Sequence, residues 1–239
     1  MSSIKESENL NKQGLFIAGN IRSGTTILWR ALNTFPDVCM LYEPLLFENA
    51  NVPDFTQWYR ERIQSYNMGN HKGTYPPAPR IDGENSAFNS LKRMAEVYRY
   101  VGEKLVFQTS KNHKLNAFIP FHKKHFPDSH YFFIVRHPVE TIWSIYQRWP
   151  DSEIGLGYQF WLWSLKVMLK AMVVFPNAYM IIFEKLTKQT PQTAADILGI
   201  SLQMPHDMIR RKSRNTNLAT MSLPEPIQAH AKAGELCTE

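Results

Sequence analysis

The sequence predicts an α/β fold, a three-layer α/β/α sandwich in which helices cover both faces of a central, mainly parallel sheet. Two observations lead to this prediction. Apolar runs of strand length alternate along the chain with longer segments of helical periodicity, which is the pattern of a parallel sheet. The chain has 239 residues, of which 44% are hydrophobic and 20% charged, and these values suit one globular domain.

The individual elements follow from the same alternation. Five apolar runs are predicted strands, at residues 14–18, 38–41, 104–107, 131–135 and 178–183. Five segments between them are predicted helices, at residues 25–33, 88–100, 115–125, 139–149 and 158–174. Pro36, Pro127 and Pro176 each follow a helical segment closely and mark its end. Residues 66–89 contain several glycines and prolines and are a predicted loop of a length typical of lids.

Composition limits the class of protein. The most apolar stretch, residues 159–175, is interrupted by a serine and two lysines, so we expect no membrane span. The first residues lack an apolar signal core, and Cys39 and Cys237 stand far apart. We therefore expect a cytoplasmic protein without a disulfide or a metal site. The net charge of +6 favours anionic partners, such as nucleic acid or a multiply phosphorylated nucleotide.

The first predicted strand runs into a turn bounded by glycines and then into a helix. Such a turn aims backbone N–H groups at one point, which suits phosphate oxygens. Gly19 and Gly24 have the spacing of a Walker A loop and Thr26 stands at its Ser/Thr position, but Thr25 replaces its lysine. The cation of this loop is Arg22. Because an ATP-hydrolysing loop uses its lysine on the β- and γ-phosphates, the sequence predicts a phosphate-ester site for other chemistry.

Residues 131–144 form a second predicted strand–turn–helix segment with an arginine after the strand. A buried strand brings Arg136 to its carboxyl end, where open parallel sheets bind ligands. Pro138 fits the first turn of the following helix. Ser144 lies about two helical turns further on and can face back toward Arg136. A guanidinium with a nearby hydroxyl is a receptor for one more phosphate group.

The two motifs together resemble the sulfotransferase family, whose donor is 3′-phosphoadenosine 5′-phosphosulfate (PAPS). The resemblance extends over roughly residues 15–212 and implies a P-loop NTPase-like α/β sandwich. It assigns the 3′-phosphate to Arg136 and Ser144. It assigns the 5′-phosphosulfate to the residues of the first loop, which are Arg22, Ser23, Gly24, Thr25 and Thr26.

Further segments extend the resemblance. Residues 126–129, 179–186 and 195–200 are similar to later parts of the family pattern, although Phe183 stands where the family has tyrosine. Residues 211–214 are basic but lack the glycine of the cytosolic members. We expect one sulfotransferase-like domain over residues 14–215. A flexible segment precedes it at residues 1–13, and a tail that can contribute to the acceptor pocket follows at residues 216–239.

Sulfuryl transfer needs a base, a cation near the bridging oxygen and in-line reactants. Arg22 is the first candidate cation, and Lys111 resembles a second family lysine. Glu43 is the first candidate base, because it follows an apolar segment and its Tyr-Glu-Pro sequence resembles carbohydrate sulfotransferases. Two alternative roles for Glu43 are that its carboxylate stabilises a turn or pairs with Arg22. His113 is the second candidate base, because Lys-Asn-His resembles the K-x-H of cytosolic members.

Two other classes of function stay open from the sequence. A P-loop kinase of small molecules predicts a lysine at position 25 and magnesium ligands, and neither is evident. A nucleic-acid-binding module predicts clustered basic and aromatic residues, whereas Arg22 and Arg136 stand singly at strand ends. Against a non-catalytic nucleotide-binding module stands the joint presence of the candidate site residues, which are Arg22, Glu43, Lys111, Arg136 and Ser144. We therefore expect PAPS as donor, adenosine 3′,5′-bisphosphate as product, and a small-molecule or glycan hydroxyl as acceptor. Metal and nucleic acid are not expected, and the oligomeric state is open.

Overall fold

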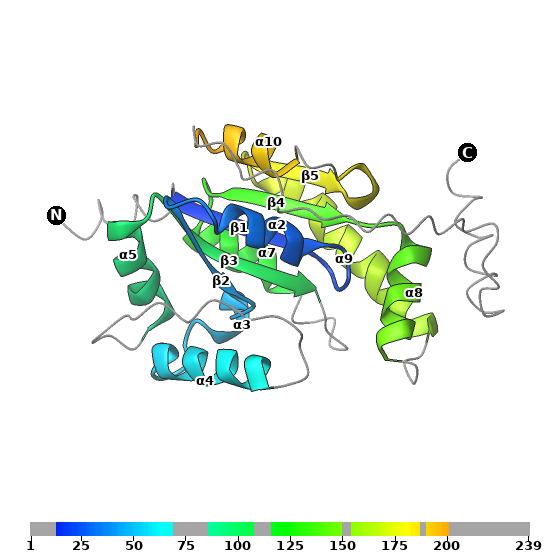
Figure 1. Cartoon of the computed structure of the whole chain (residues 1–239), viewed down its shortest axis with the longest axis horizontal. Helices are drawn as coiled ribbons and strands as arrows, with labels where there is room; N and C mark the ends of the chain where they lie inside the picture. The colour runs from blue at the N-terminus through cyan, green and yellow to red at the C-terminus, as the bar shows by residue number, and fades with distance from the viewer. Residues whose placement is uncertain (1–12, 69–85, 108–115, 150–153, 187–189, 201–239) are drawn as a thin grey trace.

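A parallel five-stranded sheet forms the centre of the protein (Figure 1). The computed structural model describes residues 13–68, 86–107, 116–149, 154–186 and 190–200. Every neighbouring pair of strands is parallel, in the order β2-β3-β1-β4-β5. The strands are β1 (Gly14–Asn20), β2 (Val38–Tyr42), β3 (Tyr100–Phe107), β4 (His130–Val135) and β5 (Ala178–Ile182).

Strand β1 lies in the middle of the sheet, and all seven of its residues are buried. Its neighbours β3 and β4 approach it closely. A Cβ atom on Gly102 of β3 would lie 2.0 Å from the carbonyl oxygen of Leu15, so only glycine fits there. The chain passes from β1 to one side of the sheet and later returns to the other side through β4. Open α/β sheets bind ligands where the strand order reverses in this way, beyond the carboxyl ends of the strands.

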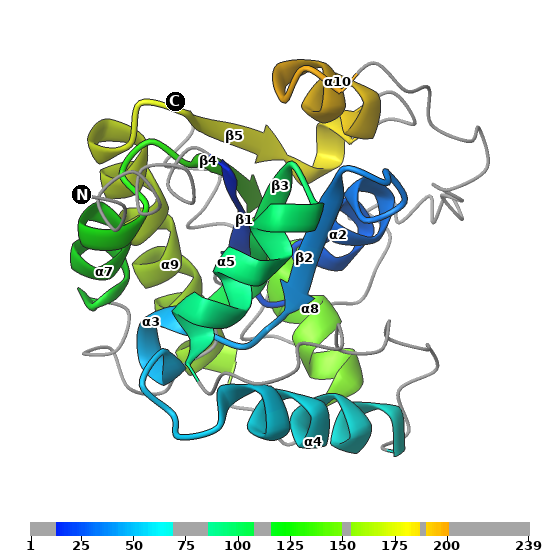
Figure 2. The same cartoon turned by 90° about the vertical axis from the view of Figure 1, so that its left-hand side faces the viewer.

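Helices cover both faces of the sheet (Figure 2). One face carries α2 (Thr25–Leu32) and α10 (Thr190–Ile197), and the other carries α7 (Phe118–His125) and α9 (Ile154–Val174). The remaining helices lie around the edges of the sheet: α3 (Leu46–Asn49), α4 (Phe55–Met68), α5 (Ala87–Val97), α8 (Pro138–Arg148) and a 3-10 turn at Phe183–Lys185. Helix α8 extends beyond the carboxyl ends of the strands (Figure 1).

The predicted three-layer α/β fold and all five predicted strands are confirmed. The helix predicted at residues 88–100 was too long, because α5 ends at Val97 and Tyr100 already opens β3. Strand β3 therefore starts four residues before the predicted position, and the added residues include Glu103, which directly precedes Lys104. The sequence also gave no signal for α4, whose apolar residues are diluted by charged and amide side chains. The predicted loop at 66–89 was too long, because residues 66–68 belong to α4 and residues 87–89 to α5; residues 69–85 lie outside the described part.

Candidate functional site

The loop between β1 and α2 has the backbone shape of an anion site. Arg22 and Gly24 both have left-handed backbone angles, with φ of 66° and 94°. A Cβ atom on Gly24 would lie 2.5 Å from two ring carbons of Phe183, so this position requires glycine. Helix α2 begins at Thr25, without a side-chain cap and without an acidic residue in its first turn. Its positive amino-terminal dipole is therefore left without a nearby carboxylate of the same helix, which favours an anionic ligand.

Several polar atoms around this loop are buried without a hydrogen-bond partner among the described residues. They include both amide atoms of Asn20 and the hydroxyl of Ser23, in residues that are 2% and 0% exposed. The Nε atom of Arg136 is also buried without a hydrogen-bond partner among the described residues. Buried polar atoms in folded proteins are nearly always paired with protein or water. A group of such atoms around one phosphate-type loop indicates a place built for a polar ligand.

Arg136 meets this loop from the next strand. It follows β4, which pairs with β1, and its Nη1 donates a hydrogen bond of 3.2 Å to the carbonyl oxygen of Arg22. Its Nη2 donates to Oε2 of Glu140 at 2.7 Å, and its guanidinium lies 4.6 Å from the ring centroid of Phe183. The two arginines predicted from separate motifs therefore share one edge of the sheet and lie in contact.

Ser144 completes this group from α8, but it faces a different partner from the one expected. Its Oγ accepts a hydrogen bond of 3.0 Å from Nε of Arg22 rather than from Arg136. Arg22 has no ion pair with any acidic residue in the described ranges, and its pKa is lowered. Partial desolvation is the largest cause, followed by the positive charges of Arg136 and Arg148. An arginine keeps its charge in spite of such a shift, so this cluster of guanidinium groups attracts an anion.

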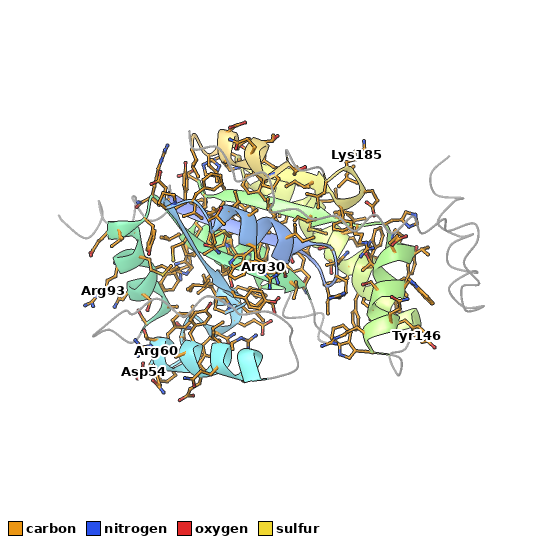
Figure 3. The ribbon with its side chains drawn as sticks, viewed as in Figure 1. Arg30, Asp54, Arg60, Arg93, Tyr146 and Lys185 are labelled. Carbon is orange, nitrogen blue, oxygen red and sulfur yellow. The ribbon has the colours of Figure 1, made fainter. Side chains whose placement is uncertain are left out.

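The backbone around Arg136 is fixed by two further side chains. The indole Nε1 of Trp161 in α9 donates to the carbonyl oxygen of Arg136 at 2.8 Å. Glu184, after β5, accepts the backbone N–H of His137 at 2.8 Å. Trp161 was not among the predicted site residues, and Glu184 was predicted only as part of a family-like segment. Helix α8 with Tyr146 lies at one end of the molecule and α5 with Arg93 at the other (Figure 3).

Glu43 follows β2 and lies two strands away from β1. Its carboxylate pairs with the ammonium group of Lys104, and the Lys104 side chain is 1% exposed. The register joins Tyr42 to Lys104 and Lys104 to Ile17, so two strand spacings, about 10 Å, separate β2 from β1. Glu43 is thus held near the same sheet edge as Arg22, and no described contact joins the two. Burial lowers the pKa of Lys104, while the adjacent Glu43 opposes that shift.

The sequence analysis missed Lys104, although a signal was present. A lysine directly after a glutamate in an otherwise apolar run requires a buried partner if the run is a strand. Two predicted catalytic residues, Lys111 and His113, lie outside the described residues, as do the basic residues 211–214. Thr25 and Thr26 lie in the first turn of α2, where Thr25 is buried.

Glu103 precedes Lys104 and is fully buried on the other side of β3. Its Oε1 accepts the backbone N–H of Leu46 at 3.0 Å, and its Oε2 has no partner among the described residues. Burial raises the pKa of Glu103 to about 8, against smaller opposing effects of backbone hydrogen bonds and of Arg62. At neutral pH this carboxyl group is therefore protonated in the folded protein and ionised in the unfolded chain.

This difference predicts a pH-dependent stability. A raised folded-state pKa contributes stability that is lost as the pH rises from the unfolded value of 4.5 through about 8. Between about pH 6.5 and pH 8, the wild type should lose about 2 kcal/mol of unfolding free energy relative to Glu103→Gln. Urea unfolding of both proteins across this pH range gives the difference between their unfolding free energies. The histidines contribute equally to both proteins, so their contribution cancels in this difference. A constant difference would show that Glu103 is already ionised in the folded state.

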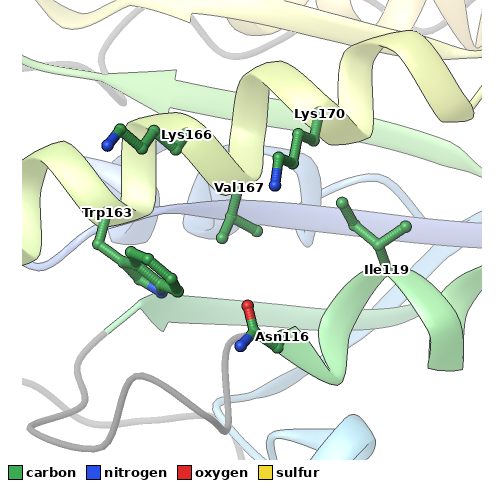
Figure 4. Close-up of a pocket in the computed structure, with 6 residues that line it drawn as sticks. All are labelled: Asn116, Ile119, Trp163, Lys166, Val167 and Lys170. Carbon is green, nitrogen blue, oxygen red and sulfur yellow. The ribbon is translucent and has the colours of Figure 1, made fainter.

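A cavity of about 160 Å³ lies between α7 and α9 (Figure 4). Trp163 and Lys170 point into it from α9, and Asn116 faces them from the segment just before α7. Ile119, Lys166 and Val167 complete the lining.

In the described ranges no three His, Cys, Asp or Glu side chains are placed to share a metal ion. Among the helices of those ranges, none is both long and apolar enough to cross a bilayer.

Comparisons with known proteins place the chain in a family. The family model described as "Sulfotransferase family" matches residues 14–203. No curated protein matches the sequence. The sulfotransferase domain from the Synechococcus PCC 7002 olefin synthase shares the fold, with a TM-score of 0.52 and 20% identity over 80% of this chain and 75% of that domain.

A mouse structure is more distant. Sulfotransferase SULT7A1 complexed with PAP gives a TM-score of 0.44 at 12% identity, over 85% of this chain and 66% of that one. The family assignment therefore rests on the family model, which covers the sheet, the loop of Arg22 and the strand of Arg136. Because this match spans most of the sequence, the chain belongs to the sulfotransferase family of sulfuryl-transferring enzymes.

Proposed function

We propose that this enzyme transfers a sulfuryl group from PAPS to a hydroxyl acceptor. The observation that carries the proposal is the contact between two arginines from separate strand ends, supplemented by the hydrogen bond from Arg22 to Ser144. PAPS carries a phosphosulfate at one end of its ribose and a phosphate at the other. Two cationic groups at adjacent strand ends suit a ligand with two anionic groups better than they suit an ester with a single phosphate.

The residues present fit this nucleotide. The left-handed loop and the amino terminus of α2 offer backbone N–H groups for the 5′-phosphosulfate, together with the unpartnered Ser23 hydroxyl. Arg136, with its unpartnered Nε, and Ser144 would hold the 3′-phosphate. PAPS supplies an activated sulfuryl group, whose sulfur forms a bond to the acceptor oxygen while its bond to the bridging phosphate oxygen breaks.

The protein side of the reaction needs a base and a cation. We propose Glu43 as the group that takes the acceptor's proton, because its carboxylate is held at the edge of the sheet and remains 14% exposed. We propose Arg22 as the group that neutralises the charge left on the departing phosphate. Strand β3 lies between β2 and β1, so two strand spacings separate Glu43 from the strand that leads to Arg22. Lys111 and His113 remain proposals as a second cation and as an alternative base.

For the acceptor we propose a sugar hydroxyl. The Tyr42-Glu43-Pro44 sequence resembles carbohydrate sulfotransferases. The cavity between α7 and α9 has a lining that can bind a sugar, because it combines an indole ring with an amide and two lysines (Figure 4). Flat aromatic rings present an apolar surface to sugars, while amide and ammonium groups bind hydroxyl and anionic substituents.

Mass spectrometry of acceptor panels tests the proposal. The enzyme is incubated with PAPS and, in separate reactions, with oligosaccharides, tyrosine peptides, lipid alcohols and small alcohols. We expect a mass gain of one SO₃ group, which appears with oligosaccharides and requires PAPS. Transfer of phosphate from ATP instead would contradict the donor assignment. Transfer of SO₃ only to a non-sugar acceptor would leave the donor assignment intact and overturn the acceptor class.

A further inference from the structure

Two ionisable residues in succession are buried in β3. Glu103 is 0% exposed and Lys104 is 1% exposed. Successive side chains of a strand point to opposite faces of the sheet. Lys104 reaches the face of α2, where its ammonium lies 4.3 Å from the ring centroid of Tyr42, which packs on Trp29. Glu103 reaches the opposite side, where it contacts Leu46 at the start of α3. Burying a charged or polar group is costly, so this pair requires a compensating role.

Both side chains contact the same short turn. Lys104 pairs with the carboxylate of Glu43 at the first residue of the turn, and Glu103 accepts the backbone N–H of Leu46 at its last. The backbone N–H of Glu43 also donates to the carbonyl oxygen of Lys104 at 2.8 Å. Strand β3 therefore holds the turn in place through a side chain on each face of the sheet and through a backbone hydrogen bond.

The turn itself has an unfavourable backbone. Glu43 and Leu45 both have positive φ, 50° and 53°, which non-glycine residues rarely adopt. Each such residue persists only where its surroundings hold it. Arg62 of α4 adds one more support, because its Nε donates to the carbonyl oxygen of Glu43 at 3.1 Å. A strained turn that is held at several points can fix the direction of one side chain.

We propose that Glu103 and Lys104 are positioning residues that hold Glu43 for proton transfer, Lys104 through the carboxylate and Glu103 through the backbone of the turn. This inference rests on the proposed role of Glu43. A base must lie within hydrogen-bond reach of the proton that it accepts, and a displacement of about 1 Å can cost a hundredfold in rate. The charged groups that face Glu43 are Lys104 from β3, which pairs with its carboxylate, and Arg62 from α4, which contacts its backbone carbonyl oxygen.

The test compares the pH dependence of kcat/KM in the wild type, Lys104→Met and Lys123→Met. Lys123 is exposed on α7 and provides the matched control. Removing the ammonium group beside the carboxylate should move the acid limb of the profile upward by about one pH unit or more. The control should leave the limb in place. A folded Lys104→Met protein with the wild-type profile would overturn the role of Lys104.

Glu103 is tested by a pair of variants and a different readout. Glu103→Gln keeps an oxygen that accepts the Leu46 N–H, whereas Glu103→Leu removes it. We expect Glu103→Leu to lower kcat by up to about a hundredfold without moving the acid limb, and Glu103→Gln to retain kcat near the wild type. Equal kcat in both variants would overturn the role of Glu103.

The outcome separates the two levels of the proposal. If Glu43→Gln keeps full turnover, the base assignment fails. If Glu43→Gln is inactive while Lys104→Met and Glu103→Leu behave as the wild type, only the positioning role fails. Should Lys104→Met not fold, Lys104→Gln retains a hydrogen-bond donor without the charge. A folded Lys104→Gln protein should show the same upward shift of the acid limb, and an unshifted limb would contradict the proposal.

Discussion

Replacing Glu43 with glutamine should lower kcat by at least about a hundredfold while leaving the affinity for adenosine 3′,5′-bisphosphate unchanged. The amide cannot accept the acceptor's proton, but it has nearly the shape of the carboxylate. Because Glu43 lies two strands from the loop of Arg22, the substitution should not disturb the nucleotide. Steady-state kinetics gives kcat, and calorimetric titration of the bisphosphate gives the affinity. Turnover near that of the wild type would remove Glu43 from the role of base and favour His113.

The stability of this variant needs a control, since Lys104 loses its charged partner. Removing one member of a buried ion pair lowers the free energy of unfolding by roughly 3–5 kcal/mol, and we expect a loss of that order for Glu43→Gln. Burial already lowers the pKa of Lys104, so the lysine can release its proton and accept a neutral partner. The double variant Glu43→Gln/Lys104→Met removes both charges of the pair. We expect it to be as inactive as Glu43→Gln but to unfold at a higher temperature.

Replacing Arg22 with methionine should lower kcat/KM by roughly a hundredfold to a thousandfold. The guanidinium is in our account the cation beside the departing phosphate, and methionine keeps part of the apolar stem without the charge. Its loss also removes the hydrogen bond that Ser144 accepts from it. The loss should appear both in kcat and in the affinity for the bisphosphate product. Single-turnover sulfuryl transfer at saturating donor separates the two contributions.

Arg93→Met is the matched control for this prediction. Arg93 lies on α5, at the opposite end of the molecule from α8, and its loss makes the same change in net charge (Figure 3). If both variants lose activity equally, the effect comes from overall charge rather than from a contact at the loop. If Arg22→Met transfers as fast as the wild type, the cation at the donor is a different residue.

Much of this fold follows from the sequence because buried parallel strands are continuous apolar runs. The runs at residues 14–18 and 131–135 identified β1 and β4 and, with them, the positions of Arg22 and Arg136 at strand ends. That both arginines meet at one edge follows from strand order. A single sequence does not contain this order directly, and the family resemblance supplied it.

The parts that the sequence analysis missed are those that depend on partners distant in the chain. Glu103 lies outside the predicted strand at 104–107, and the pairing of buried Lys104 becomes evident only when the register places it beside Tyr42 and Glu43. Ser144 lies near Arg136 in sequence, yet its hydroxyl accepts from Arg22, which is 122 residues away. Helix α4 has too mixed a surface for periodicity to reveal it.

If one nucleotide spans Arg22 and Arg136, its 3′-phosphate contributes to the affinity through Arg136, and calorimetric titration of two nucleotides measures that contribution. Adenosine 3′,5′-bisphosphate and AMP differ only in the 3′-phosphate, and each is titrated into the wild type and into Arg136→Met. The wild type should bind the bisphosphate more tightly than AMP, and Arg136→Met should lose this preference while its affinity for AMP is retained. Equal affinities of the wild type for the two nucleotides, or an Arg136→Met variant that keeps the full preference, would contradict this placement of the nucleotide.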